Sequence, residues 1–260
     1  IETLVLVYQG GMLSPGCEQA SFQVRVQPDE RRLFFLGKGR TQPLTYSSLG
    51  HQEGAGAAFF EQFVEDIFPL SRQAAAALAD HLSLKAAAGP VSVLDLAAGS
   101  GVWGITLAEA SPRVRVTAVD WPGVLTVTKR VAERHGVADR FTFVPGDLRD
   151  ADFGTGHHVA TLGHILHSEG EARSRELLKK TFAALAPGGT IAIAEWVVNE
   201  DRTGPPPGLI FAANMLVNTD EGDTFTFGEM SGWLRDAGFT DPRLLDVPSV
   251  SPLVLATKPG

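Results

Sequence analysis

Cysteine is almost absent from this sequence, since Cys17 is the only one among 260 residues. A single cysteine excludes an internal disulfide and a thiolate metal cluster formed by this chain alone. Basic residues are also few, with 22 lysines and arginines against 30 acids and a formal net charge of −8. This balance argues against nucleic acid as a partner, because binding to a phosphate backbone usually needs a basic face. No run of 18 apolar residues is present, so we expect no membrane span, no membrane partner and a cytoplasmic location.

The composition suits a folded protein, and the sequence patterns divide it into three segments. With 44% hydrophobic residues, the chain can bury a sizeable core. Residues 1–50 lack a clean period, although "SFQVRVQ" alternates well enough for one strand and "RRLFFLG" suits another. In residues 51–88, apolar side chains recur at helical spacing, which Pro69 interrupts and Gly89-Pro90 ends. We therefore expect an N-terminal strand-and-turn segment, linking helices and a larger domain over residues 89–260.

Strand-like and helix-like stretches alternate through the larger domain. The strand-like stretches are "VSVLDL", "VRVTAVD", "FTFVPGD", "HVATLGHI" and "TIAIAEW", with helices expected from Val102, from about Pro122 and from about Glu169. This alternation predicts a parallel sheet with helices on both faces. The last two strands, "RLLDVP" and "SPLVLATK", are joined by too few residues for a crossover helix, so they must pair antiparallel. We predict an α/β fold with a doubly wound, mostly parallel seven-stranded sheet, an antiparallel C-terminal strand and a short N-terminal segment.

The stretch "VLDLAAGSGVWG" contains the G-x-G-x-x-G pattern of a dinucleotide-binding turn in Gly99, Gly101 and Gly104. Asp95, however, lies inside the end of the preceding strand. A carboxylate there would repel a pyrophosphate but could serve a cationic ligand. S-adenosylmethionine is such a ligand, because it carries an ammonium and a sulfonium. On this interpretation the third glycine only allows close packing of the helix.

Two further acids stand at the ends of the next strands. Asp120 closes "VTAVD" and could accept both hydroxyls of a ribose, since a carboxylate binds two donors well. Asp147 follows in "VPGDL", and Leu148 or Trp121 could cover a base. The carboxyl ends of strands in an open α/β sheet are where ligands bind, so three acids there indicate a ligand site rather than plain turns.

From about Tyr46 to the C-terminus, the chain resembles class I S-adenosylmethionine-dependent methyltransferases. Within that class it is similar to the small-molecule O-methyltransferases related to plant caffeic acid O-methyltransferase and to bacterial polyketide methyltransferases. The resemblance is carried, in family order, by "VLDLAAGSG", "AVDWP", "FVPGDL", "HILHSEGEA", "LAPGGTIAIAEW" and "WLRDAGF". It implies a Rossmann-like fold, S-adenosylmethionine as cofactor, a small-molecule acceptor and a homodimer, with residues 1–50 as a remnant of the dimerisation region.

The resemblance also implies roles for individual residues. The cofactor-binding residues that it implies are Asp95, Ala97, Gly99, Gly101, Asp120, Trp121, Asp147 and Leu148. Ala97 stands where the family has a glycine. The family's general base falls on His167, and the acid that orients this base falls on Glu195. A histidine suits removal of a hydroxyl proton, and an acid beside it fixes the tautomer and stabilises the imidazolium. The second glutamate of the plant members is replaced by Thr224.

Alternatives remain for these histidines. His167 could instead be a half-buried structural residue. The set His157, His158, His164 and His167 invites a metal site. We expect none, because a spacing of three leading out of a strand should point the rings of His164 and His167 to opposite faces.

The acceptor site is the least defined part of the sequence. Its candidate residues are Phe63, Phe211, Asn214, Met215 and Asn218, with Phe59 and Phe60 nearby. An aromatic and methionine lining suits a flat, apolar acceptor, whereas ordinary core packing is the alternative for the phenylalanines. The two asparagines lie one helical turn apart and could bind acceptor hydroxyls.

Two other functions also fit parts of the sequence. A NAD-dependent oxidoreductase would use the same glycine pattern and Asp120, although Asp95 and the antiparallel strand argue against it. A non-catalytic, cofactor-binding member of the methyltransferase family would fit the loss of the second glutamate at Thr224.

Overall fold

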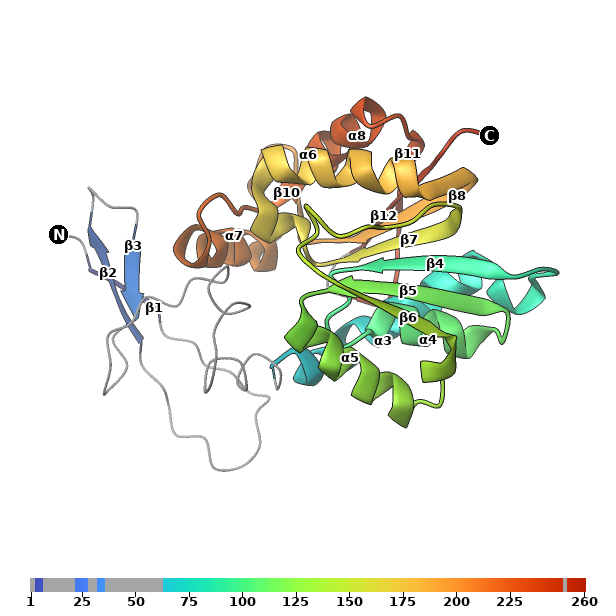
Figure 1. Cartoon of the computed structure of the whole chain (residues 1–260). Coiled ribbons are helices and arrows are strands. Elements are labelled where there is room, and N and C mark those ends of the chain that lie inside the picture. Colours follow the sequence, from blue (N-terminus) through green and yellow to red (C-terminus); the bar gives the residue numbers. More distant parts are fainter. Residues whose placement is uncertain (1–2, 7–21, 28–31, 36–62, 250–251) are drawn as a thin grey trace.

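The computed structural model describes residues 3–6, 22–27, 32–35, 63–249 and 252–260. Its main body is a seven-stranded sheet with helices on both faces (Figure 1). The strands are β4 (Val91–Leu96), β5 (Val114–Asp120), β6 (Phe141–Pro145), β7 (His157–Gly163), β8 (Leu185–Ala194), β11 (Thr240–Leu245) and β12 (Leu253–Thr257). Their order is β11-β12-β8-β7-β4-β5-β6. Strand β12 pairs antiparallel with both β8 and β11, and the other neighbouring strands pair parallel. The predicted fold class is therefore confirmed.

The two faces of the sheet are covered by different helices (Figure 1). Helices α3 (Phe68–His81), α4 (Val102–Ala110) and α5 (Pro122–Arg134) pack on one face, and α6 (Leu166–Ala184) and α8 (Phe227–Asp236) pack on the other. Within β4, Val93 is buried against the first group, whereas Leu94 and Leu96 are buried on the second side. Both sides of the strand are apolar because each side meets a helix layer, which explains its continuous hydrophobic sequence.

The expected interruption near Pro69 is present, because a helical stretch at residues 63–66 ends before Ile67 and Pro69 lies in the first turn of α3, where its missing N–H costs nothing. One helix boundary differs from the sequence predictions. Helix α6 begins at Leu166, earlier than the expected Glu169, and contains a non-helical residue at Gly170 with φ of 72°. The earlier start places His167 in the first turn of α6 rather than on a strand.

Smaller elements complete the described chain. A separate antiparallel sheet joins β1 (Thr3–Leu6), β2 (Phe22–Gln27) and β3 (Arg32–Phe35), so both strands expected in this segment are present. Helix α7 (Pro206–Asn218) and the short parallel pair of β9 (Val197–Val198) and β10 (Phe225–Thr226) follow β8. Single 3-10 turns occur at Leu84–Ala86 and Ala138–Arg140. None of the helices in these described ranges has both the length and the apolar character needed to cross a bilayer.

Candidate functional site

The glycine loop after β4 bends sharply into α4. Gly99 and Gly101 have φ of 56° and 80°, in the left-handed region that glycine adopts without strain, and Gly101 caps α4. A Cβ on Gly101 would lie 2.8 Å from Cγ2 of Thr128. Oγ1 of Thr128 donates to the carbonyl of Gly99 at 2.6 Å, which fixes the loop against α5. The loop therefore needs glycine for both its backbone conformation and its close packing.

Gly104, the last glycine of the pattern, lies inside α4 and faces the sheet. A Cβ there would be 2.7 Å from Cγ1 of Val116 and 2.9 Å from Oδ2 of Asp95. Its N–H donates to the same Oδ2 at 2.9 Å. These contacts agree with the interpretation that Gly104 serves helix packing.

Asp95 is fully buried beneath this loop. One carboxylate oxygen accepts from Gly104, and the other accepts from Oγ1 of Thr161 at 2.8 Å. Burial raises the pKa of Asp95 to about 7; the two hydrogen bonds oppose this, and the charge of Asp120 adds to it. Asp95 thus ties β4, α4 and β7 together.

Asp120 connects the loops at three strand ends. Its Oδ2 accepts from the N–H of Gly99 at 2.9 Å, and its Oδ1 accepts from the N–H of Trp121 at 2.7 Å. Its carbonyl accepts from the N–H of Gly146 at 3.0 Å, on the loop that follows β6. Burial raises the pKa of Asp120 to about 6, against the effect of the two backbone donors. Each carboxylate oxygen keeps a lone pair for a further donor. The indole of Trp121 packs against the core on the α3–α5 side.

The raised pKa values predict that the free protein loses stability as pH rises from 5.5 to 8. Asp95 and Asp120 hold protons more tightly in the folded state, with pKa values near 7 and 6, than in the unfolded chain, where acids titrate near 4. The contribution of protonation to the free energy of unfolding is therefore complete below about pH 4. It is lost as the pH rises through the pKa values of the folded state. Asp95→Asn removes one titrating group and should flatten the curve. Urea unfolding of both proteins at the two pH values measures this, and an equal pH dependence would contradict the assignment to Asp95.

Asp147 and Leu148 lie on the loop after β6. Both carboxylate oxygens of Asp147 accept hydrogen bonds from the Arg149 guanidinium, at 3.0 and 2.8 Å. This partner holds the pKa of Asp147 at about 2. Among the described residues, the N–H of Leu148 donates to no other group. A carboxylate acceptor beside a free amide donor matches the edge of an adenine, which offers a donor next to an acceptor.

His167 and Glu195 form a buried pair after β7 and β8. Nδ1 of His167 lies 2.9 Å from Oε2 of Glu195, and its backbone N–H donates to Oε1 at 3.3 Å. Burial alone would raise the pKa of Glu195, but the charge and hydrogen bonds of His167, with the charge of His164, lower it below its ordinary value. Glu195 is therefore a carboxylate, and it assigns the proton to Nδ1 of His167. Nε2 forms no hydrogen bond to the described residues and is left as the basic atom.

Aromatic rings surround this pair. Phe211 meets the ring of His167 edge to face, with centroids 4.9 Å apart, and Trp196 stacks on Phe211 at 5.0 Å. The ring of His164 lies 6.5 Å from that of His167. The expectation that these two rings point to opposite faces was wrong, because His164 has φ of 60° and the chain then enters α6 instead of continuing as a strand. Burial lowers the pKa of His164, against the opposing charge of Glu195.

The other acceptor-site candidates are distributed differently. Phe63 is 37% exposed, whereas Met215 is 1% exposed and belongs to the packed interior. Asn214 and Asn218 lie one turn apart on α7, but Nδ2 of Asn218 donates to Oδ1 of Asn214 at 2.8 Å, so each amide already has a partner. Phe211 is the candidate that the structure brings against His167. Phe59 and Phe60 lie outside the described residues.

A loop at residues 219–224 packs on the backbone of His167. The N–H of Asp223 donates to the carbonyl of His167 at 2.9 Å, and a Cβ on Gly222 would lie 2.4 Å from that oxygen. Thr224 is 1% exposed, and within the described ranges its hydroxyl has no hydrogen-bond partner. Sequence reasoning found Thr224 by comparison with the family pattern but missed Gly222 and Trp196. In the sequence, the only signals for these two residues are the glycine itself at position 222 and the tryptophan that directly follows Glu195.

Metal ligands do not gather in the described part of the chain, where no three histidine, cysteine, aspartate or glutamate side chains could hold one ion. His157 and His158 lie at the start of β7, and Ser92 contacts both, with its hydroxyl 2.9 Å from Nδ1 of His157 and its N–H 3.0 Å from Nδ1 of His158. They are thus at the opposite edge of the sheet from His164 and His167.

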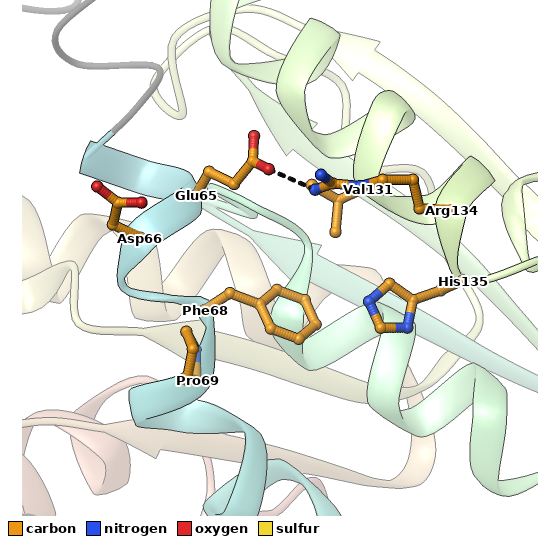
Figure 2. A pocket seen from close by; sticks show the side chains of 7 residues that line it. All are labelled: Glu65, Asp66, Phe68, Pro69, Val131, Arg134 and His135. Atoms are coloured by element: carbon orange, nitrogen blue, oxygen red, sulfur yellow. Dashed lines mark ion pairs between the residues drawn. The ribbon is translucent and has the colours of Figure 1, made fainter.

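A cavity of about 310 Å³ lies between the start of α3 and the end of α5 (Figure 2). It is lined by Glu65, Asp66, Phe68, Pro69, Val131, Arg134 and His135. The Glu65 carboxylate points toward Arg134 and pairs with it and with Arg130, which holds the pKa of Glu65 below its ordinary value. Glu65 is therefore committed to two ion pairs on the wall of this cavity.

Ala97 carries the clearest local strain of the site. Its φ is 52°, in the left-handed region that costs an L-residue with a Cβ about 1–2 kcal/mol. Glycine would remove this strain but adds entropy to the unfolded chain, so Ala97→Gly should stabilise the protein by about 0.5 kcal/mol. Ala110→Gly, in the last turn of α4, is the matched control and should destabilise it by about 0.5–1 kcal/mol. Urea unfolding measures both, and a loss of stability in Ala97→Gly would contradict the strain.

Comparisons with known proteins are consistent with this geometry. Residues 47–240 match the family model of the O-methyltransferase domain. The chain is 32% identical over 183 residues to the 3-hydroxy-5-methyl-1-naphthoate 3-O-methyltransferase of Streptomyces sahachiroi. The aligned region covers 70% of this chain and 52% of that protein. It is also 32% identical over 173 residues to the tetracenomycin polyketide synthesis 8-O-methyl transferase of Streptomyces glaucescens, covering 65% of this chain and 49% of that protein.

A solved structure shares the fold. The crystal structure of a Nostoc punctiforme protein assigned to the O-methyltransferases superimposes with a TM-score of 0.72 and 31% identity, covering 76% of this chain and 60% of that one. The chain spans about half the length of the curated relatives that it matches, at 52% and 49%.

Proposed function

The chain belongs to the O-methyltransferase domain family, whose cofactor is S-adenosylmethionine, and we propose that it transfers the methyl group of this cofactor to a hydroxyl of a small molecule. The observation that carries the proposal is the buried His167–Glu195 pair beside the glycine loop and Asp120, all at the carboxyl ends of adjacent parallel strands. That edge is where open α/β sheets bind ligands.

The residues at this edge fit the cofactor. Asp120 has lone pairs for the ribose hydroxyls, and the N–H of Leu148 beside the Asp147 carboxylate suits the adenine. The buried charge of Asp95 favours a cationic ligand over a pyrophosphate. When bound, S-adenosylmethionine supplies a methyl group that its sulfonium makes electrophilic.

The proposed work of the protein is removal of a proton from the acceptor and orientation of its oxygen. Nε2 of His167 takes the proton of the acceptor hydroxyl, while Nδ1 stays hydrogen-bonded to Glu195. The carboxylate then stabilises the imidazolium without accepting the proton itself. Because methyl transfer from a sulfonium to an oxygen neutralises charge, alignment of the oxygen contributes much of the remaining acceleration.

For the acceptor we propose a flat, largely apolar molecule, aromatic or polyketide-like. Phe211 and Trp196 offer stacked faces next to His167. Two of the relatives act, by their names, on a naphthoate and in polyketide synthesis. These observations support the class of acceptor and leave its hydroxyl position to experiment.

Binding calorimetry and a methylation assay together test the proposal. We expect the protein to bind S-adenosylhomocysteine and to transfer a labelled methyl group from S-adenosylmethionine to members of a panel of phenols and hydroxynaphthoates. Binding of NADH without binding of S-adenosylhomocysteine would replace the proposal with an oxidoreductase. Binding of the cofactor with no acceptor methylated across the panel would favour a non-catalytic member, which the replacement of the second glutamate by Thr224 would fit.

A further inference from the structure

Three backbone carbonyls after β6 converge on one side chain of α6. Nζ of Lys180 donates to the carbonyl of Leu148 at 2.8 Å, to that of Arg149 at 2.9 Å and to that of Ala151 at 2.6 Å. A lysine ammonium has three hydrogens, so these bonds use all of them. Lys180 therefore spends its whole donor capacity on the loop that follows Asp147.

An aromatic ring also contacts the ammonium of Lys180. The ammonium lies over the ring of Phe153, 4.1 Å from the centroid. Burial lowers the pKa of Lys180, while the charges of Asp150, Asp152 and Asp147 oppose this shift. An ammonium bonded to three carbonyls, over an aromatic face and near acids, remains a cation that is costly to displace.

Side-chain packing holds the end of this loop, because Ala151 is buried in the same core as Leu177 and Leu178 of α6, but it leaves a gap beside Leu148 and Arg149. A cavity of about 170 Å³ lies there, lined by Leu148, Arg149, Glu169, Arg173, Glu176, Leu177 and Lys180. Within the loop, the carbonyl of Asp147 accepts from the N–H groups of Asp150 and Ala151, at 3.0 and 2.8 Å, which makes a local turn. The bonds from Lys180 tie this turn to α6 beside that cavity.

The same loop presents the groups that suit the adenine. Asp147 and Leu148 lie at its start, and the N–H of Leu148 has no partner among the described residues while its carbonyl is bound to Lys180. Fixing a carbonyl fixes the plane of the following peptide, so Lys180 sets the direction of the loop next to those groups. The segment Leu166–Ala184 also carries His167, before the non-helical Gly170, so the base and Lys180 belong to the same stretch of chain.

We propose that Lys180 is a positioning residue for the cofactor's adenine, acting through the loop Leu148–Ala151 without contacting the ligand. This inference rests on the proposed function. Loss of the three bonds would let the loop sample other conformations, and the ligand would then have to order it on binding.

Binding of two ligands to Lys180→Met tests the inference. Methionine keeps the length and apolar stem but removes the donors. We expect Kd to rise about 10-fold for S-adenosylhomocysteine, and by the same factor for 5′-methylthioadenosine, which keeps the adenosine and lacks the amino-acid end. The KM for S-adenosylmethionine should rise by more than kcat falls. Lys179→Met, on the exposed neighbouring residue, is the matched control and should change neither constant.

Hydrogen exchange separates positioning from a merely structural role. In Lys180→Met, amides at residues 148–151 should exchange faster while those of β7 remain protected. A lower melting temperature with unchanged Kd values for both ligands would overturn the inference. If the methionine variant does not fold, Lys180→Arg carries the test, because a planar guanidinium cannot meet the three carbonyls in the same geometry and Kd should still rise about 3-fold. Failure of the wild-type protein to bind S-adenosylhomocysteine would instead refute the proposed function.

Discussion

His167→Ala should lower kcat by about 10²- to 10⁴-fold, the range that a positioned general base contributes. The reason is that Nε2 of His167 has no other partner among the described residues, while Nδ1 is committed to Glu195 at 2.9 Å. Because His167 is proposed to act on the acceptor and not on the cofactor, the Kd for S-adenosylhomocysteine should change less than about 3-fold. Steady-state kinetics with a phenol that the wild type methylates, and calorimetry with S-adenosylhomocysteine, measure the two effects.

The matched control for this variant is His81→Ala, at the exposed end of α3. It should retain full activity and binding. Turnover of His167→Ala at the wild-type rate would show that the base is another group. His164 would then be the residue to replace next, since its ring lies 6.5 Å away and burial lowers its pKa.

Glu195 should act through His167 and not independently of it. Glu195→Gln keeps the shape of the side chain but lets its amide present a donor to Nδ1 of His167, which favours the wrong tautomer. We expect a large loss of kcat, and a double variant with His167→Ala that is no worse than His167→Ala alone. If the losses of kcat in the two single variants add up in the double variant, Glu195 does not act through His167.

Asp120→Asn should raise the Kd for S-adenosylhomocysteine by about 100-fold. Asp120 accepts from Gly99 and Trp121 with its two oxygens, and we propose that the remaining lone pairs bind the ribose hydroxyls. Asparagine has only one acceptor oxygen, so its amide hydrogens must face either a backbone N–H or a ribose hydroxyl. Charge-assisted bonds of this kind contribute about 1.5–3 kcal/mol each, which is enough for the expected loss. Calorimetry with S-adenosylhomocysteine measures it.

Asp139→Asn is the control for this charge change, because Asp139 is exposed and lies in the turn before β6. It should bind as the wild type does. Unchanged affinity of Asp120→Asn for S-adenosylhomocysteine would exclude the carboxylate as the ribose ligand.

The sequence alone determined the architecture and the position of the site. Alternation of apolar strands with amphipathic helices, and a final connection too short for a crossover, predicted the mostly parallel sheet and its antiparallel strand. Parallel strands bring their carboxyl ends to one edge, so acids at successive strand ends had to lie near one another. Asp95, Asp120 and the His167–Glu195 pair follow from that rule because β4, β5, β7 and β8 are neighbours in the sheet.

Tertiary structure decided what each side chain does at that edge. The sequence could not show that Asp95 is sealed beneath the loop by Thr161, or that Asn214 and Asn218 bind each other. Nor could it show that Lys180 reaches three carbonyls about 30 residues away in the chain. Periodicity reports which side of its own element a residue occupies. Hydrogen-bond partners depend instead on how elements distant in sequence pack, and even a single left-handed residue, His164, was enough to redirect two rings.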